Sequence, residues 1–391
     1  MTHLTVERRL ALLLASTRAV REARAGEIVG LASRTDSRGL LTLLDRLQLS
    51  VLLGQRLKEV AGGLDPWLEE QIRVRAFAAR ENGEAQEMVA LGILASLSRA
   101  GIRALGLKGV VLARQLYGDA GARPSADIDI LVSAANLAHA IEVVGQMGWR
   151  RKEPASAGSR LPILHEGLVH PALPMVELHW RVHWYETRFA GDLLARAQSP
   201  ARRQPLVMDP ADGLAALTLF YARDGFSGLK MAADVATWWD SRCDAADADA
   251  VISTIAAGYP ELAGALWVAT GVLGSLVGLP TRFTGGPLRW QIAAELASPF
   301  TAPTAGHLGA IASLVDLLLT PRGGRAASLR REVQKVPKGL ERPLTVDDGL
   351  FAYLARSEHV LRVTRRWAMA LACATSRAYR QGADSQTASV A

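Results

Sequence analysis

Two aspartates separated by one residue, Asp127 and Asp129, are the part of this sequence best suited to chemistry. They lie in the run ADIDILV, residues 126–132, whose alternation of polar and apolar residues is typical of a β-strand. Residues two apart on a strand point to the same face, so the two carboxylates are expected side by side. Like charges at that distance raise each other's pKa, and a divalent cation relieves the repulsion. The pair therefore predicts a metal site, and magnesium, which prefers hard oxygen ligands, is the expected ion.

A third carboxylate lies on a second alternating segment, MVELHWRV at 175–182. Glu177 and His179 share the polar face of this expected strand. If the strand pairs beside the first, Glu177 can complete the metal site or remove a proton from an acceptor hydroxyl. His179 can then orient Glu177 or contact the substrate.

Basic and glycine residues near the aspartates favour phosphate binding. Lys108 and Gly109 lie between an expected strand and an expected helix, where glycine allows close backbone approach and the first helical amides can receive a phosphate. Lys108 adds a positive charge there. Arg123, four residues before Asp127, suits a phosphate or a carboxylate through its planar guanidinium. The alternatives are a simple turn at Gly109 and solvent-exposed basic side chains.

Other metal chemistry has less support from the sequence. The segment around the second strand contains four histidines: His165, His170, His179 and His183. Their spacings match no familiar tetrahedral zinc pattern, so we do not expect a zinc site. The two cysteines, Cys243 and Cys373, are far apart in sequence and indicate neither a zinc site nor a disulfide framework. A reducing, cytoplasmic location is the expectation.

The segments around these residues predict an α+β protein. Residues 1–100 have helical patterning, 101–185 form a small α/β unit with a mixed sheet, and 186–380 return to helical patterning. The last residues, 381–391, are expected to be disordered. The N-terminal segment has charges among its apolar positions, which indicates an amphipathic helix and not a signal peptide.

One apolar segment needs a separate decision. Residues 262–279 carry no charge over eighteen positions, the lower limit for a membrane-spanning helix. They contain four glycines, and Pro260 and Pro280 flank them without a basic residue on either side. We therefore predict a buried core helix and no membrane span.

The formal net charge is +7, and residues 320–343 form a basic stretch rich in turn residues. A positive surface favours polyanionic partners such as nucleotides or RNA. A solvated basic loop is the favoured interpretation, given the arginine-rich composition of the stretch. No aromatic residues interleave with its charges, so a base-stacking surface is not indicated.

The order of these motifs resembles a known family. The run LGLKGVVLARQLYGDAGARPSADIDILV at 105–132, followed by VELHWRV at 176–182, is similar to the bacterial uncharacterised nucleotidyltransferase family of the DNA-polymerase-β-like superfamily. The resemblance covers about residues 35–240. It implies that Asp127 and Asp129 bind the metal and that Glu177 is the third carboxylate.

The same resemblance assigns roles to basic residues. It implies that Lys108 and Gly109 correspond to the superfamily's phosphate loop, and that Lys230 and Asp234 form a basic–acidic pair able to reach the nucleotide. A surface salt bridge at i, i+4 spacing is the alternative for that pair. Many members have Gly-Ser or Gly-Gly in the loop, whereas this chain has Gly109 followed by valine. Ser125 or Lys108 is expected to substitute for the missing serine.

The resulting expectation is a nucleotidyltransferase that uses two Mg²⁺ ions, or Mn²⁺, to move an NMP from an NTP to an acceptor and release pyrophosphate. A small molecule, a peptide or protein, and RNA all remain open as acceptors, and the base is open too. One alternative is a sugar-nucleotide-dependent glycosyltransferase, although the βαβ repeats expected before its motif are absent. Another is a non-catalytic nucleotide-binding or antitoxin-like protein, against which the presence of all three acids argues.

Overall fold

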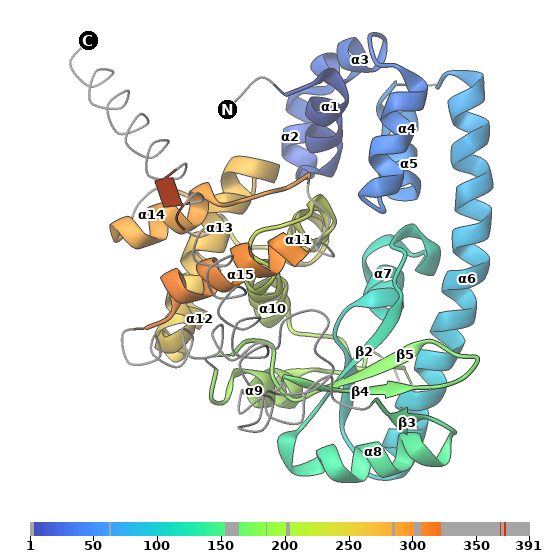
Figure 1. Ribbon diagram of the computed structural model, residues 1–391, viewed down its shortest axis with the longest axis vertical. Coiled ribbons are helices and arrows are strands. Elements are labelled where there is room, and N and C mark those ends of the chain that lie inside the picture. Colours follow the sequence, from blue (N-terminus) through green and yellow to red (C-terminus); the bar gives the residue numbers. More distant parts are fainter. Residues whose placement is uncertain are drawn as a thin grey trace, which may run out of the picture.

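A five-stranded mixed sheet carries the two aspartates, and helices lie on both sides of it (Figure 1). The computed structural model describes residues 4–61, 64–152, 164–184, 186–200, 204–283, 286–300 and 306–321, together with 368, 371 and 372. The predicted tail at 381–391 and residues 322–343 of the basic stretch lie outside the described residues. The predicted α+β class, with a small mixed sheet and flanking helices, is confirmed.

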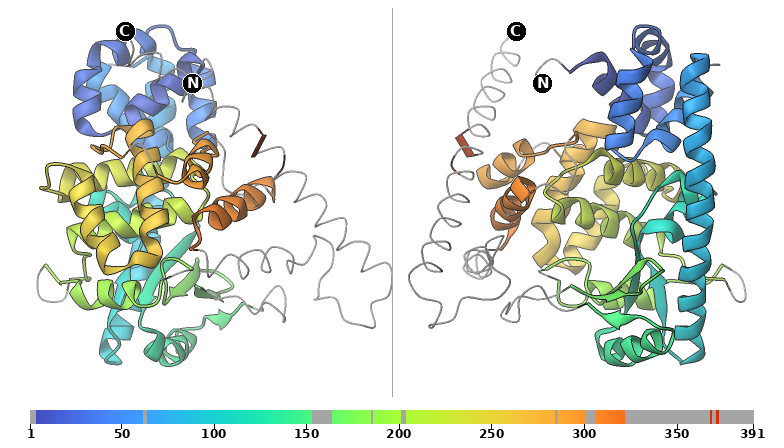
Figure 2. Two further views of the ribbon diagram at one scale, coloured as in Figure 1. Left: turned by 90° about the vertical axis from the view of Figure 1, so that its left-hand side faces the viewer. Right: turned by 45° about the vertical axis from the view of Figure 1, so that its right-hand side comes forward.

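The N-terminal part of the chain is helical throughout its described residues. Its helices are α1 (Val6–Ala15), α2 (Arg18–Ala23), α3 (Ala25–Ala32), α4 (Ser37–Arg46), α5 (Ser50–Ala61) and α6 (Pro66–Arg99). Helix α6 begins as the sequence dictates, because Asp65 accepts a hydrogen bond from the Leu68 amide and proline occupies the first helical position. This long helix runs beside α4 and α5 at one end and beside the sheet at the other (Figure 2).

The part of the chain that forms the sheet follows directly in the sequence. Its strands and the helices between them are β1 (Ala104–Gly106), α7 (Gly109–Tyr117), η1 (Ala120–Ala122), β2 (Asp127–Val132), η2 (Ala134–Asn136), α8 (Leu137–Gln146), β3 (Arg150–Arg151), β4 (His165–Val169) and β5 (Met175–His179). The strand order is β1-β2-β5-β4-β3, and β2 and β5 are parallel whereas the other pairs are antiparallel. Asp129 lies directly opposite Glu177 in this register.

The two faces of the sheet have opposite characters, as the alternation predicted. Ile128, Ile130 and Leu178 are buried with apolar side chains of α6 and α8. Residues opposite one another on paired strands share a face, so Asp129 and Glu177 both lie on the other face. That face is turned toward the C-terminal helices, where the ring of Phe220 lies 6.4 Å from that of His179.

The C-terminal part is again helical. Its described helices are α9 (Phe189–Arg196), α10 (Pro210–Arg223), α11 (Leu229–Arg242), α12 (Ala248–Gly258), η3 (Pro260–Leu262), α13 (Ala263–Val277), α14 (Leu288–Glu295) and α15 (Gly306–Leu319).

Helix α13 contains most of the uncharged segment. Within the described residues, Pro260–Val277 is the one segment long and apolar enough to cross a membrane by length and composition, and 56% of it is buried inside the protein. Leu266, Ala269 and Leu273 belong to the main hydrophobic core. This packing is that of the core helix which the sequence favoured.

The loop before β2 is attached to α11 by buried polar contacts. Arg123, which is 4% exposed, donates from Nε to Asp234 Oδ2 at 2.5 Å. The Tyr117 hydroxyl donates to Asp234 Oδ1 at 2.7 Å. Lys230 Nζ donates to the Pro124 carbonyl oxygen at 2.9 Å. One turn of α11 therefore holds the end of α7 and the loop that leads into the aspartate strand.

The Arg123–Asp234 pair generates a stability prediction. We expect Asp234→Ala to lower the free energy of unfolding by about 3–5 kcal/mol, because it leaves the Arg123 guanidinium buried without its counter-ion. The matched control is Asp45→Ala, which removes the ion pair between Asp45 and Arg75. Both side chains of that pair are about one-third exposed, and we expect its loss to lower the free energy of unfolding by less than about 1 kcal/mol. Urea unfolding followed by circular dichroism measures both. Equal losses for the two variants would contradict the role given to the buried pair.

Candidate active site

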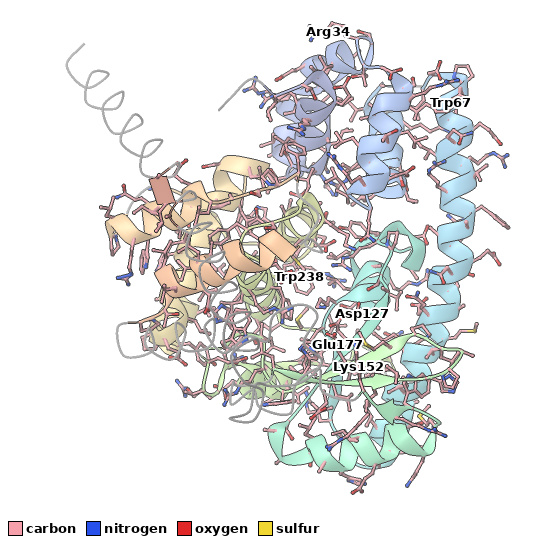
Figure 3. All side chains as sticks on the ribbon, viewed as in Figure 1. Arg34, Trp67, Asp127, Lys152, Glu177 and Trp238 are labelled. Carbon is pink, nitrogen blue, oxygen red and sulfur yellow. The ribbon has the colours of Figure 1, made fainter. Side chains whose placement is uncertain are left out.

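Three carboxylates meet on the face of the sheet that is turned toward the C-terminal helices. Because β2 and β5 are parallel neighbours, their acidic residues come from corresponding positions along the two strands. One oxygen from each of Asp127, Asp129 and Glu177 lies within 4.8 Å of the other two. Figure 3 shows Asp127 and Glu177 close together in the middle of the molecule. The sheet thus brings together the three acids that the sequence identified separately.

Asp129 is an ionised carboxylate in a buried position. It is 1% exposed, and its Oδ1 receives Lys108 Nζ at 2.5 Å and lies 2.9 Å from His179 Nε2. Burial alone would raise the pKa of Asp129, but the Lys108 ammonium and the His179 hydrogen bond outweigh it and hold the pKa well below its usual range. The site therefore retains a negative charge at neutral pH.

The same residues fit a hard divalent cation. Asp129 Oδ2 is buried and has no hydrogen-bond partner, and the Asp129 carboxylate belongs to the cluster of three acids. Burial also acts to raise the pKa of Glu177, but the hydrogen bond from His179 overcomes it and lowers the pKa, so this side chain is an anion as well. Buried carboxylate oxygens that lack a donor are suited to bind Mg²⁺ or Mn²⁺.

The start of α7 lies against the aspartate strand. Gly109 has φ of +67°, and a Cβ there would lie 3.2 Å from the Asp127 carbonyl oxygen and 3.3 Å from Ser125 Oγ. Ser125 Oγ in turn hydrogen-bonds Asp127 Oδ1 at 3.0 Å. A hydroxyl from the neighbouring loop therefore lies next to Gly109.

Arg123, Lys230 and Asp234 are arranged differently from the simple expectation. In place of a surface salt bridge with Lys230, Asp234 is buried and pairs with Arg123. The charge of Asp234 outweighs the effect of burial and raises the pKa of Arg123. Lys230 donates to Gln48 Oε1 at 2.7 Å as well as to the Pro124 carbonyl. Burial, with a smaller effect from Arg123, lowers the pKa of Lys230 to about 8.

The structure adds two residues to the site that the sequence analysis gave no role. Phe220 of α10 is fully buried, with Lys108 Nζ 5.8 Å and the Arg223 guanidinium 4.7 Å from its ring centroid. Neither Phe220 nor Arg223 belongs to a local sequence motif. Their spacing, which places both on one turn of α10, was the only signal in the sequence that could have linked one to the other. They bring a second cation toward the acidic cluster.

His165 also lies at the site, a position that the spacing of the histidines did not indicate. It lies opposite His179 in the β4–β5 register, and its Nε2 is 3.5 Å from Glu177 Oε1. The contact depends on strand pairing between residues fourteen positions apart, which no spacing rule reveals.

Comparison with known proteins supports the family resemblance. The sequence model of a family described as uncharacterised nucleotidyltransferase matches residues 33–272, a range that includes every strand and all the site residues discussed above. Searches of curated proteins and of solved structures gave no match. Because the family match spans more than half of the chain, the protein belongs to the uncharacterised nucleotidyltransferase family.

Proposed function

We propose that this protein transfers a nucleoside monophosphate from an NTP to an acceptor and releases pyrophosphate, with Mg²⁺ held by Asp127, Asp129 and Glu177. The observation that carries the proposal is the pairing of Asp129 with Glu177 across parallel strands, which places three carboxylates within 4.8 Å of one another. Membership of a nucleotidyltransferase family supports the same reaction class. Mn²⁺ suits the same oxygen ligands.

Each acid has a distinct task in this proposal. Asp127 and Asp129 bind the metal, and Asp129 stays ionised through its contacts with Lys108 and His179. When bound, two divalent ions supply positive charge that stabilises the attacking and leaving oxygens. Glu177 is ionised because its pKa is lowered, so its carboxylate has a free lone pair that can receive the proton of the acceptor hydroxyl.

The bond changes follow from these tasks. The acceptor oxygen forms a bond to the α-phosphorus, and the bond from that phosphorus to the oxygen bridging to the β-phosphate breaks. The acceptor proton passes to Glu177, and pyrophosphate leaves with the electron pair. The charge that develops on phosphate oxygens is stabilised by positioned donors, which act strongly in a site with little water.

The start of α7 supplies those donors. Free amides at a helix N-terminus attract phosphate, and Lys108 adds a full positive charge at the same place. The Ser125 hydroxyl lies beside Gly109 and can complete the phosphate cradle. Arg123 and Asp234 act by holding the loop that contains Ser125, since their own charged groups are occupied with each other.

Nucleotide binding tests the proposal most directly. We expect wild-type protein to bind at least one of the four NTPs in calorimetry only when Mg²⁺ is present. The Asp127→Asn/Asp129→Asn variant should lose at least tenfold in affinity, or about 1.4 kcal/mol, because it removes two metal ligands while keeping their shape.

Glu166→Gln is the matched control for this experiment. Glu166 lies on β4 opposite Leu178, and its register position belongs to the other face of the sheet. We expect it to bind as wild type does, with unchanged circular dichroism in all variants. If no NTP binds wild type, the proposed reaction is wrong, and binding of a sugar nucleotide instead would favour the glycosyltransferase alternative.

The phosphate cradle can be tested with two glycines of the same helix. Gly109 and Gly118 flank α7 with nearly equal φ values, +67° and +68°, but a Cβ at Gly118 meets nothing within 4 Å. Both alanine variants carry a strain of about 1–2 kcal/mol. We expect Gly109→Ala alone to weaken nucleotide binding, by about tenfold, because its Cβ presses on Ser125 and the Asp127 backbone. Equal affinities of the two variants in the same calorimetric assay would contradict the cradle.

A further inference from the structure

Two histidines border the carboxylate site on the side of β4. Glu177 lies on β5, with Asp129 opposite it on β2 and Gly167 opposite it on β4. Because glycine has no side chain, nothing on β4 covers Glu177 directly, and the next pair along these strands is His165 with His179. One ligand atom from each of His165, Glu177 and His179 lies within 4.8 Å of the others. This grouping shares Glu177 with the carboxylate site but adds two nitrogen ligands.

The distances suit ligands of a common ion. His165 Nε2 lies 3.5 Å from Glu177 Oε1, and His179 Nε2 lies 3.3 Å from Glu177 Oε2. The His165 contact is longer than a usual hydrogen bond, and the His179 contact is at the long end of the range. Two ligand atoms bound tetrahedrally to zinc at its normal bond lengths are about 3.4 Å apart, which is the separation seen here. The two contacts involve different oxygens of Glu177, so its carboxylate lies between the two nitrogens that would bind the ion with it.

Burial and the nitrogens that face Glu177 define the ligand atoms. The His179 side chain is fully buried and its Nε2 faces both Glu177 and Asp129. Nδ1 of His179 and Nδ1 of His165 are buried without a hydrogen-bond partner. Each ring therefore offers Nε2, the nitrogen nearest Glu177, as its ligand atom. Metal binding through Nε2 of His179 would release the proton that this nitrogen shares with Asp129. The ring centroids are 4.8 Å apart.

The ligand set selects a class of metal. Imidazole nitrogen favours zinc and other late first-row ions, whereas Mg²⁺ requires oxygen ligands and near-octahedral geometry. The adjoining Asp129 carboxylate adds negative charge that favours any cation at this position.

We propose that His165, Glu177 and His179 form a binding site for a zinc-class transition-metal ion, adjacent to the magnesium site and sharing Glu177 with it. Metal binding at this site requires no nucleotide. Only one consequence of this proposal rests on the proposed function: an ion at the histidine site draws Glu177 away from its task in nucleotidyl transfer. Occupation of this site by zinc would therefore lower nucleotidyl transfer without displacing the NTP.

Cobalt substitution provides a test that is independent of activity. Co²⁺ that has nitrogen ligands and a coordination number of four or five absorbs visible light much more strongly than Co²⁺ surrounded by oxygen ligands. The full chain is stripped with a chelator and titrated with Co²⁺ in the absence of nucleotide. We expect a visible band that saturates at one equivalent and disappears when one equivalent of Zn²⁺ is added.

Two variants assign the band to these residues. His165→Gln should lower Co²⁺ affinity at least tenfold, whereas His170→Gln, which removes a histidine that accepts from the Ala172 amide in the turn after β4, should leave it unchanged. A band that is missing in wild type, or that is equally strong in His165→Gln, would overturn the proposal.

A third variant separates this proposal from the proposed function. Asp127→Asn removes a ligand of the carboxylate group alone, so it should weaken Mg²⁺-dependent NTP binding and leave the Co²⁺ band in place. If wild type shows the band but binds no NTP, the histidine site stands while the proposed transfer reaction is wrong. If NTP binds with Mg²⁺ but the band is absent, the reverse holds.

Discussion

The buried charge of Asp129 is the constraint on which the rest of the site depends. A carboxylate that is 1% exposed loses nearly all its hydration, and only close positive or donor groups offset that loss. Here the offset comes from Lys108 at the start of α7 and from His179 at the end of β5. The position of Asp129 therefore ties the start of α7 to the strand that carries Glu177.

A second buried charge pair has a matching role at the border with the C-terminal helices. Arg123 and Asp234 are both almost fully buried and neutralise each other, which is weak evidence for added stability but does fix a unique arrangement. Gln86 of α6 donates to the Ser125 carbonyl oxygen, and Lys230 donates to that of Pro124. The loop that leads into β2 is thus held from α6 and α11 at once, although these helices are far apart in sequence. Helices outside the sheet determine where Ser125 lies relative to Gly109.

Local patterns were sufficient for part of this arrangement. Period-two alternation assigned Asp127, Asp129 and Glu177 to polar strand faces, because side-chain direction in a strand depends only on position along it. The α+β class followed from the change between helical and alternating patterns. The register that pairs Asp129 with Glu177 is a long-range property, but two strands with one polar face each leave few ways to bury the apolar faces.

Other contacts were out of reach of local patterns. The i, i+4 spacing of Lys230 and Asp234 suggested a surface pair, yet burial of Asp234 requires a closer and better oriented partner, which Arg123 supplies from 111 residues away. His165 showed no useful spacing to another ligand, because its neighbours are set by the β4–β5 register. In both cases the partner of a polar side chain is set by the tertiary structure. The distance between the two residues along the sequence gave no information about which partner it would be.

The charges in the site explain why acids and histidines are found side by side. When ionised, Asp127, Asp129 and Glu177 carry three negative charges, and Lys108, which contacts Asp129, carries one positive charge. Against these three acids, Lys108 leaves an excess of negative charge that attracts a cation. Additional lysines could neutralise this excess, but they would occupy the oxygens that a metal must reach. An imidazole such as that of His179 can orient these carboxylates by hydrogen bonding, so the sheet keeps its acids in place and still attracts a cation.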